Sequence, residues 1–334
     1  MKASAAGAAR SNGSDKLAGK RGTPEMRNVA PTLLITAACV MAIYGREAVS
    51  QPACDKACLE GIAAQYRAAY VKHDPGLAPI AKDVRFTENN VEMRFPDASW
   101  DTVTKEVGPA LTISDPSSGN VGIYTAIMQL DTPGFLAVRL KIQRGKITEI
   151  EHIVSTKRNL SGPPTPMGDV NEFKHDPDLA QSVPAAERSS RAQLISLANG
   201  YFSTLEHNNG EIRGTRFSPD ASRFENGKQF AEIEKGFKSG TYAFNNRVRD
   251  RDFFLVDEER GIVMSRAYID HKGMLDAYKL TDGTEKRSIF REPHTWSVLE
   301  MFKIKNGMIT GVEATFIGAP YYIRSPWTRH PDPR

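Results

Sequence analysis

The stretch DVRFTENN, residues 83–90, alternates like a β-strand and carries an arginine, an aromatic residue and a glutamate. A second stretch, DASRFENG at residues 220–227, gives nearly the same order again in the second half of the chain. Glu88 in the first stretch aligns with Glu225 in the second. This recurrence indicates that one structural unit is present twice, with an acidic residue at the same place in each copy.

The sequence around the two stretches repeats in the same way. Residues 57–73 and 191–206 both place apolar side chains at helical spacing, and each precedes its echoed stretch. Near the end of each half, residues 135–154 and 296–315 read as two strands around a tight turn, which is the pattern of a β-hairpin. Three matched features in the same order predict a duplicated α+β domain.

The predicted organisation has five parts. Residues 159–189 hold five prolines among polar residues and are predicted to be a linker with little regular structure. The other four parts are an N-terminal extension with a signal peptide (1–50), a first domain (51–158), a second domain (190–327) and a tail (328–334).

Composition excludes several classes of protein. The chain has 334 residues, of which 40% are apolar and 25% charged, and this is typical of soluble globular domains. The net charge of +4 is small, and part of it lies in the first 27 residues. Because no basic stripe with interleaved aromatic residues is present, nucleic acid is not expected as a partner.

The N-terminus has the layout of a secretory signal peptide. Residues 32–44 form an apolar run that is too short to span a bilayer comfortably, and basic residues precede it. Ala48-Val49-Ser50 follows as a cleavage signal of the small-x-small type. A start at Met26 would give a more ordinary signal than a start at Met1, and an uncleaved anchor is the alternative. We therefore expect an exported protein, periplasmic or secreted, without a stable membrane span after cleavage.

Cysteine usage agrees with export. Cys39 would leave with the signal peptide, so Cys54 and Cys58 would remain as a pair at the start of the mature chain. Residues four apart on a helix or its entry turn can come within reach of a disulfide bond, which an oxidising compartment favours. A metal site would need further ligands, and no His or Cys lies nearby.

Several stretches carry a family resemblance. One leading helix followed by antiparallel strands and a long hairpin resembles the cone of the nuclear transport factor 2-like superfamily, which includes ketosteroid isomerase, scytalone dehydratase and SnoaL-like polyketide cyclases. CDKACLEGIAAQY, HDPGLAPIAKDVRFTENN and EMFKIKNGMITGVEA resemble, more narrowly, an uncharacterised secreted family of bacteria and fungi. The resemblance covers roughly residues 54–327 and implies two tandem cones, each a helix packed in a curved antiparallel sheet, arranged as an intramolecular pseudo-dimer.

The resemblance also implies where an acid would act. In the isomerases an acidic base lies on the strand that follows the helical part, and Glu88 and Glu225 match that position. The isomerase base is usually Asp followed by Pro, whereas here Glu is followed by Asn. Either glutamate is a candidate general base whose pKa an apolar pocket would raise. The alternative is an ion pair with Arg85 or Arg223 that fixes the strand.

The second domain carries more candidates than the first. His294 and Trp296 fall on one face of a predicted strand, where they could move protons and bind a ring. Asp270 and His271 end another strand and could form an acid–base pair or half of a metal site, although a solvated turn is the alternative. Asn226, next to Glu225, is a further substrate-binding candidate.

The tyrosines of the two helices complete the candidate set. Tyr66, Tyr70 and Tyr201 lie on the inner faces of the predicted helices and are either core residues or ligand-binding hydroxyls. In the isomerases a tyrosine stabilises the enolate, and the resemblance implies the same role here.

The sequence lacks the signatures of nucleotide, metalloprotease and serine-hydrolase chemistry. We therefore expect no tightly bound cofactor and no metal. The leading hypothesis is a lyase or isomerase that acts by acid–base chemistry on a small carbonyl-bearing or oxygenated ring compound, with the second domain as the active one. The alternative is a non-catalytic module that binds small molecules or has a structural role.

Overall fold

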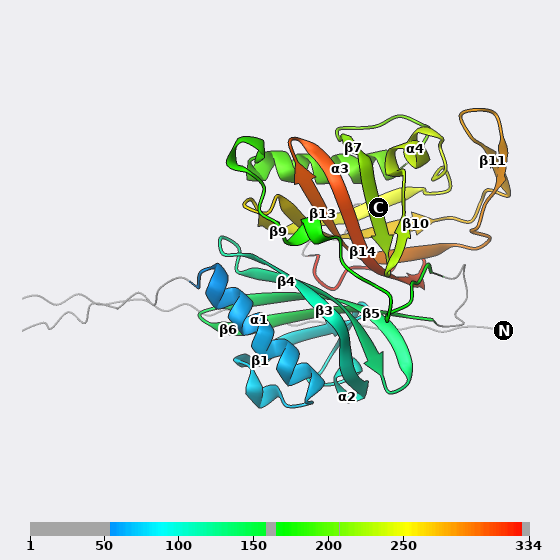
Figure 1. Cartoon of the computed structure of the whole chain (residues 1–334). Helices are drawn as coiled ribbons and strands as arrows, with labels where there is room; N and C mark the ends of the chain where they lie inside the picture. The colour runs from blue at the N-terminus through cyan, green and yellow to red at the C-terminus, as the bar shows by residue number, and fades with distance from the viewer. Residues whose placement is uncertain (1–53, 158–164, 207, 329–334) are drawn as a thin grey trace, which may run out of the picture. The chain divides into compact units, whose positions relative to one another are not determined.

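The computed structural model describes residues 54–157, 165–206 and 208–328 (Figure 1). The signal peptide and N-terminal extension predicted for residues 1–50, and nearly all of the predicted tail, lie outside the described residues. In the described part of the chain, no helix combines the length and the apolarity that crossing a membrane requires.

The first domain is a curved six-stranded sheet with a leading helix across one face (Figure 1). The sheet order is β2-β1-β6-β5-β4-β3, in which β1 and β6 run parallel and the other neighbours antiparallel. Its elements are α1 (Lys56–Val71), η1 (Pro75–Leu77), β1 (Ile80–Glu88), β2 (Val91–Met93), α2 (Ser99–Thr102), β3 (Val103–Asp115), β4 (Asn120–Gln129), β5 (Thr132–Gln143) and β6 (Lys146–Thr156).

The second domain repeats this plan strand for strand. Its sheet order is β8-β7-β14-β13-β10-β9, again with one parallel pair, β7 and β14. Its elements are α3 (Arg191–Leu205), β7 (Phe217–Glu225), β8 (Lys228–Phe230), α4 (Ile233–Lys238), β9 (Arg247–Asp257), β10 (Ile262–His271), β11 (Ala277–Lys279), β12 (Glu285–Arg287), β13 (His294–Lys305) and β14 (Met308–Pro320). The predicted α+β fold of two tandem domains is confirmed.

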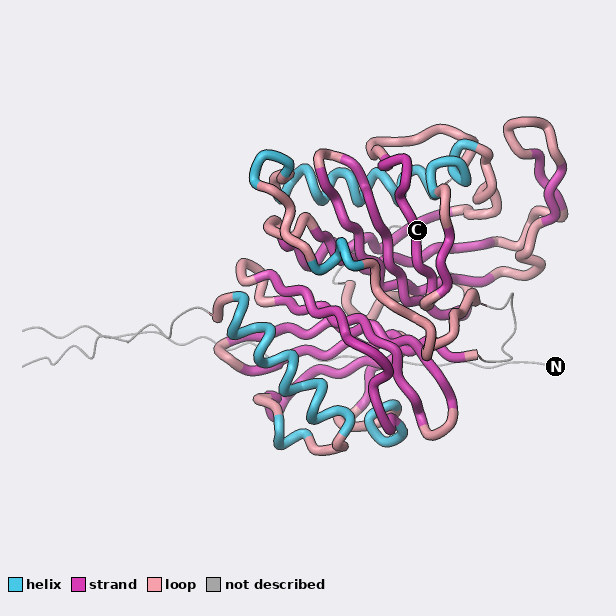
Figure 2. Tube along the Cα trace, in the orientation of Figure 1, coloured by secondary structure: helices cyan, strands magenta, loops and turns pink. Residues whose placement is uncertain are grey.

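One connection differs between the domains. The first domain joins β4 to β5 through residues 130–131 alone, whereas the equivalent strands β10 and β13 are joined by residues 272–293. This segment, here named the insert, forms its own two-stranded sheet of β11 and β12 and extends past the end of the main sheet (Figure 2).

The repeated stretch ends a strand in a two-residue turn. Asn89 and Asn90 have φ of 51° and 69° and join β1 to β2, while Asn226 and Gly227 have φ of 45° and 75° and join β7 to β8. Two successive positive φ angles are the geometry of a type I′ hairpin turn, which Asn and Gly adopt more readily than other residues. The motif therefore places Glu88 and Glu225 as the last residue of each first strand.

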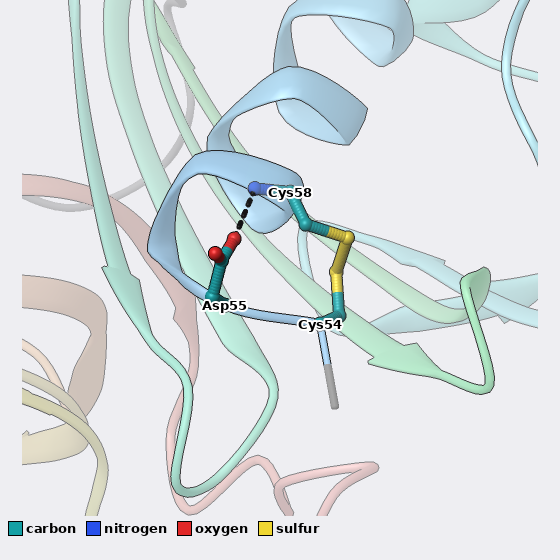
Figure 3. The surroundings of a disulfide bond; sticks show 3 residues. All are labelled: Cys54, Asp55 and Cys58. Carbon is teal, nitrogen blue, oxygen red and sulfur yellow. Dashed lines mark hydrogen bonds between the residues drawn. A yellow bond between two sulfur atoms is a disulfide. The ribbon is translucent and has the colours of Figure 1, made fainter. Parts of the chain in front are cut away.

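Local signals explain where the two leading helices begin. The carboxylate of Asp55 accepts a hydrogen bond from the backbone N–H of Cys58 at 2.9 Å, and Cys54 forms a disulfide with Cys58 across the same turn (Figure 3). In α3 the side chains of Ser190 and Gln193 form a capping box. Each helix buries its apolar face against its own sheet, so packing as well as capping stabilises it.

Buried side chains join the two sheets. One apolar cluster combines Leu111, Ile113 and Tyr124 of the first domain with Leu255 and Met264 of the second, among others. At this contact the guanidinium of Arg266 pairs with the carboxylate of Glu151, and both side chains are 3% exposed. The two-fold symmetry of the expected pseudo-dimer stays a prediction.

The described part of the predicted linker, residues 165–189, packs against both domains. It contains two short 3₁₀ helices, η2 (Pro177–Ala180) and η3 (Ala185–Glu187). The ring of Phe173 lies edge-on to Phe135 of the first domain and to Phe224 of the second. Apolar anchors therefore fix a segment that the sequence shows only as rich in proline.

Candidate functional site

A cavity of about 40 Å³ lies in the second domain between α3 and the sheet. Its walls come from α3, from four strands and from the loop that precedes β9. The lining residues are Tyr201, Leu205, Arg223, Glu225, Tyr242, Asn245, Ile269, Trp296, Val298, Glu300, Ala314 and Phe316. Apolar and aromatic groups thus surround a few polar ones, which is the usual composition of a ligand site.

Strand register brings two glutamates to this cavity. Ala314 of β14 is paired with Glu225 of β7 on one side and with Glu300 of β13 on the other. Paired residues point to the same face of a sheet, and neighbouring strands lie about 4.8 Å apart, so the two backbones are about 10 Å apart. The small side chain of Ala314 between the two glutamates leaves space for the cavity.

Arg223 forms a close ion pair with Glu225. The Nε of Arg223 lies 2.8 Å from a carboxylate oxygen of Glu225. The same guanidinium donates hydrogen bonds to the hydroxyl oxygens of Tyr201 (3.0 Å) and Tyr242 (2.7 Å). Since Arg223 is 4% exposed, its charge is poorly screened and favours a negative partner.

Glu300 is in the opposite electrostatic situation. Burial raises its pKa from 4.5 to about 8; the positive charge of Arg223 and the hydroxyl of Tyr201 oppose this rise, and the negative charge of Glu225 adds to it. Glu300 is therefore mostly protonated at neutral pH and can donate a hydrogen bond. One cavity thus holds one carboxyl group paired with a guanidinium and a second one that burial keeps protonated. Two carboxyl groups in such different surroundings can take the separate roles of base and acid.

The first domain fills the same place with side chains. At the position of Ala314 it has His152, which pairs with Glu88 and Val138. Val138 thus replaces Glu300, and no second carboxyl group faces Glu88 across this row of the sheet. The imidazole of His152 is fully buried and occupies the space that an alanine methyl group leaves open in the second domain.

A hydrogen-bonded network surrounds Glu88. Ser99 donates its hydroxyl to the carboxylate of Glu88, and the Nδ1 of His152 lies 3.4 Å from the same oxygen. A hydrogen bond of 2.7 Å joins the Nε2 of His152 to the hydroxyl of Tyr66, which also accepts from the indole of Trp100. Every member of this network has a partner within the domain, which is typical of a structural polar cluster.

The structure brings some predicted residues together and separates others. Glu225, Tyr201 and Trp296 line the cavity. His294 and His271 lie beside Trp296, with ring centroids 6.1 and 4.8 Å away, but they are not among the lining residues. Glu88, Tyr66 and Tyr70 belong to the interior of the first domain. Of the proposed alternatives for Glu225, the pairing with Arg223 is present.

Two candidates lie away from the cavity. Asn226 uses its amide to accept from the backbone N–H of Phe316 (2.9 Å) and to donate to the carbonyl of Pro166 (3.0 Å), so it holds the hairpin turn. Asp270 pairs with Arg247 and Arg249 on the other face of β10.

The solvated turn considered for Asp270 and His271 is wrong. Both residues lie inside β10, and both are fully buried. The burial has a physical reason: two arginines neutralise the aspartate, and Phe290 of the insert stacks on the imidazole. The local sequence of the strand does not show these contacts, because the arginines and Phe290 come from other segments of the chain.

Sequence reasoning missed Glu300, Tyr242 and Asn245. Glu300 had a signal, because it lies four residues after Trp296 on an alternating strand and therefore on the same face. A glutamate within the apolar segment SVLEMF needs a reason to be there. Tyr242 and Asn245 lie in a loop, where no periodicity indicates direction.

In the described residues, no three side chains of His, Cys, Asp or Glu come together as a group that could hold a metal ion. The polar groups of the cavity are two carboxyl groups, two phenols, one guanidinium, one carboxamide and one indole. This set suits the recognition of a neutral or anionic oxygenated molecule.

Comparisons with known proteins give one family match. A family profile described as a domain of unknown function (DUF8021) matches residues 187–316, which is less than half of the chain. A search of the curated proteins gives no match.

Three solved structures illustrate the likeness. They are a de novo designed protein with a curved β-sheet (16% identity, TM-score 0.27), PrhC from Penicillium brasilianum (14%, 0.27) and an NTF2-like protein of unknown function from Cytophaga hutchinsonii (10%, 0.23). Each match covers 39% of this chain and 88%, 83% and 100% of the other chain, respectively. The names include the superfamily that the sequence resembles. At these scores the matches carry no conclusion about activity.

Proposed function

We propose that the second domain is a small-molecule lyase or isomerase that works by acid–base chemistry on a carbonyl-bearing or oxygenated compound. The observation that carries the proposal is the pair Glu225 and Glu300, which face one cavity in different surroundings: Glu225 contacts a guanidinium, and burial raises the pKa of Glu300 to about 8. A carboxylate and a carboxylic acid on two sides of one substrate can remove one proton and donate another.

The roles follow from the contacts of each group. Glu225, which contacts Arg223, takes the proton from a carbon next to an electron-withdrawing group. Negative charge then develops on the substrate oxygen, and the protonated Glu300 donates a hydrogen bond or its proton to that oxygen. The proton on Glu225 returns to a different carbon in an isomerase, or to a departing oxygen in a lyase.

The size of the cavity limits the substrate. A cavity of about 40 Å³ is far smaller than the roughly 150 Å³ cavity that takes up benzene in an engineered protein core. A ring compound therefore enters only if a wall moves. Trp296 and Tyr242 form the part of the wall that packs on the insert, so this part is the one we expect to move.

The alternative function is a module that binds small molecules without catalysis. The observation that favours it is the close ion pair of Arg223 and Glu225, because a carboxylate engaged by a guanidinium is a weaker base. In both cases the first domain, with its filled interior, serves as a scaffold.

The test combines binding with turnover. The protein beginning at Gln51 would be screened by thermal unfolding against small carbonyl compounds, with its Glu225→Gln and Glu300→Gln variants in parallel. A compound at 100 times its Kd adds about 2.7 kcal/mol of stability. We expect at least one compound to stabilise all three proteins and to be converted by the wild type alone. Equal conversion by Glu225→Gln would exclude the proposed base.

We also propose that the protein is exported. The disulfide between Cys54 and Cys58 supports this proposal, because such bonds persist in oxidising compartments. Expression of the full chain followed by fractionation should find a shortened protein, beginning near Gln51, outside the cytoplasm. A protein of full length in the cytoplasm would contradict the proposal.

A further inference from the structure

The insert (residues 272–293) places one aromatic ring over a buried histidine. Phe290 lies parallel to the imidazole of His271, with ring centroids 3.8 Å apart and an interplanar angle of 10°. The same ring lies 5.1 Å from Trp296, which lines the cavity, and 5.2 Å from His294. Phe290 therefore lies next to Trp296 in the wall of the cavity and is 1% exposed.

The fold itself does not need this ring. In the first domain a two-residue turn joins the equivalent strands, and that domain forms the same six-stranded sheet. The insert also exposes apolar side chains, since Met274 is 76% and Ile289 53% exposed. Its contacts with the domain include Phe290, the backbone and hydroxyl of Thr281, and Tyr278, whose hydroxyl donates to the carbonyl of Thr241 at 2.7 Å.

Polar groups beside Phe290 are buried without partners. The Nε2 of His294 and the Nε1 of Trp296 have no hydrogen-bond partner among the described residues, and His294 is 5% exposed. A buried polar group without a partner destabilises the folded state. A benzyl ring cannot relieve this cost, whereas a ring that carries oxygen can.

The backbone leaves room beside the free nitrogen of His294. Gly318 of β14 is paired with Trp296, and a Cβ added there would lie 3.7 Å from the Nε2 of His294. An alanine at this position would make ordinary contacts, while a larger side chain would fill the space next to the nitrogen. Gly318 does not have a positive φ, so the backbone accepts other residues.

The protonation state of the histidines suits a neutral ligand. Burial lowers the pKa of both His271 and His294, so both rings are uncharged near neutral pH. The Nε2 of His271 lies 2.8 Å from the amide oxygen of Asn245, whose own N–H donates to the carbonyl of Leu205. His271 therefore carries its proton on Nε2. This hydrogen bond fixes the orientation of the imidazole ring, and one face of the ring stacks on Phe290.

We propose that His271, His294, Trp296 and Gly318 form a subsite for a planar, oxygen-substituted ring, and that Phe290 of the insert occupies this subsite until a ligand replaces it. The ring of the ligand stacks on His271 in place of Phe290, and its oxygen accepts from the indole N–H of Trp296 and pairs with His294. This inference rests on the proposed function in one respect. It takes the ligand of the subsite to be the substrate, whose reacting carbon would reach Glu225.

The experiment measures how phenol and toluene bind, because the two have nearly equal size and only phenol can form hydrogen bonds. Calorimetry or NMR titration would compare the wild type with Phe290→Ala and with Phe244→Ala. Phe244 lies in the same cluster, 5.0 Å from Phe290, and its truncation is the matched control. We expect Phe290→Ala to bind phenol at least tenfold more tightly than the wild type does. We also expect it to prefer phenol over toluene by about three- to tenfold, as one hydrogen bond gives.

The control should open an apolar cavity and show no preference for phenol. Equal binding of phenol and toluene by Phe290→Ala, or no binding of either, would overturn the proposal. If Phe290→Ala does not unfold cooperatively, two variants at Gly318, which keep Phe290 and the whole insert, test the proposal instead. Gly318→Val should then bind phenol at least tenfold more weakly than Gly318→Ala, and equal or undetectable binding by both would overturn the proposal.

The same titration separates this inference from the proposed function. Glu225→Gln should bind phenol within twofold of the wild type, because Glu225 lies outside the subsite. If no carbonyl compound is ever converted but phenol binds as expected, the subsite stands and the catalytic proposal fails. If a carbonyl compound is converted but Phe290→Ala binds phenol and toluene equally, the catalytic proposal stands and the subsite proposal fails.

Discussion

Replacing Glu300 by glutamine should change how the stability of the protein depends on pH. Burial raises the pKa of Glu300 in the folded state to about 8, from the usual 4.5. Between these two values the folded state keeps a proton that the unfolded state releases. The unfolded state therefore binds fewer protons, and the free energy of unfolding falls as pH rises through this window.

The magnitude follows from the two pKa values. For one group with pKa 4.5 unfolded and about 8 folded, the loss of stability between pH 5 and pH 7 is about 2.5 kcal/mol. Glutamine is neutral at every pH and has nearly the shape of a protonated glutamate, so Glu300→Gln should lack this loss. For a protein of this size the difference corresponds to about 4 °C in Tm.

The assay is thermal unfolding of the wild type and Glu300→Gln at several values between pH 5 and pH 8. The Tm of the variant minus that of the wild type should grow steadily with pH. The exposed Glu285 provides the control, and Glu285→Gln should follow the wild type within about 1 °C. A constant difference between Glu300→Gln and the wild type would refute the reasoning, because Glu300 would then titrate alike in both states.

Three further changes have outcomes that the contacts determine. Ala314→Val should fill the space between the two glutamates and abolish the thermal shift caused by any cavity ligand, while a ligand-induced shift equal to that of the wild type would contradict the location of the site. Glu151→Gln should lower the free energy of unfolding by about 3 kcal/mol in a denaturant titration, since Arg266 then keeps only Asp252, a more exposed carboxylate, as its charged partner. A loss below 1 kcal/mol would mean that the ion pair of Arg266 and Glu151 contributes little to the contact between the two sheets. Cys58→Ser should cost about 2 kcal/mol, as expected for a short loop, and reduction of the wild type should give the same loss.

The sequence predicted the fold well because the duplication was visible. Each half of the sequence shows a helix, a strand ending in Glu-Asn and a closing hairpin in the same order. These elements are the first helix, the first strand and the last two strands of each domain in the structure. The alternation of strands also placed Trp296 on the inner face, and the helical period did the same for Tyr201. The turn residues Asn226 and Gly227 fixed the end of the strand that carries Glu225.

The site was predicted only in part, because it depends on pairings between strands. That Ala314 lies between Glu225 and Glu300 follows from the register of three strands, which no local pattern reveals. The equivalent position in the first domain is His152, and this single difference changes an open space into a filled one. The insert likewise has a largely polar sequence, although it buries Phe290 beside Trp296 of the cavity wall.

The most direct test of the second domain as an acid–base catalyst is the exchange of carbon-bound protons with solvent. The wild type would be incubated in D₂O with a panel of small carbonyl compounds, and loss of the proton signal next to the carbonyl would be followed by NMR, with Glu225→Gln and Glu88→Gln in parallel. We predict exchange with at least one compound, a loss of about 10²-fold or more in Glu225→Gln, and a rate within about twofold of the wild type in Glu88→Gln. Exchange that is absent throughout, or that is equally fast in Glu225→Gln, would contradict the assignment of a catalytic base to this cavity.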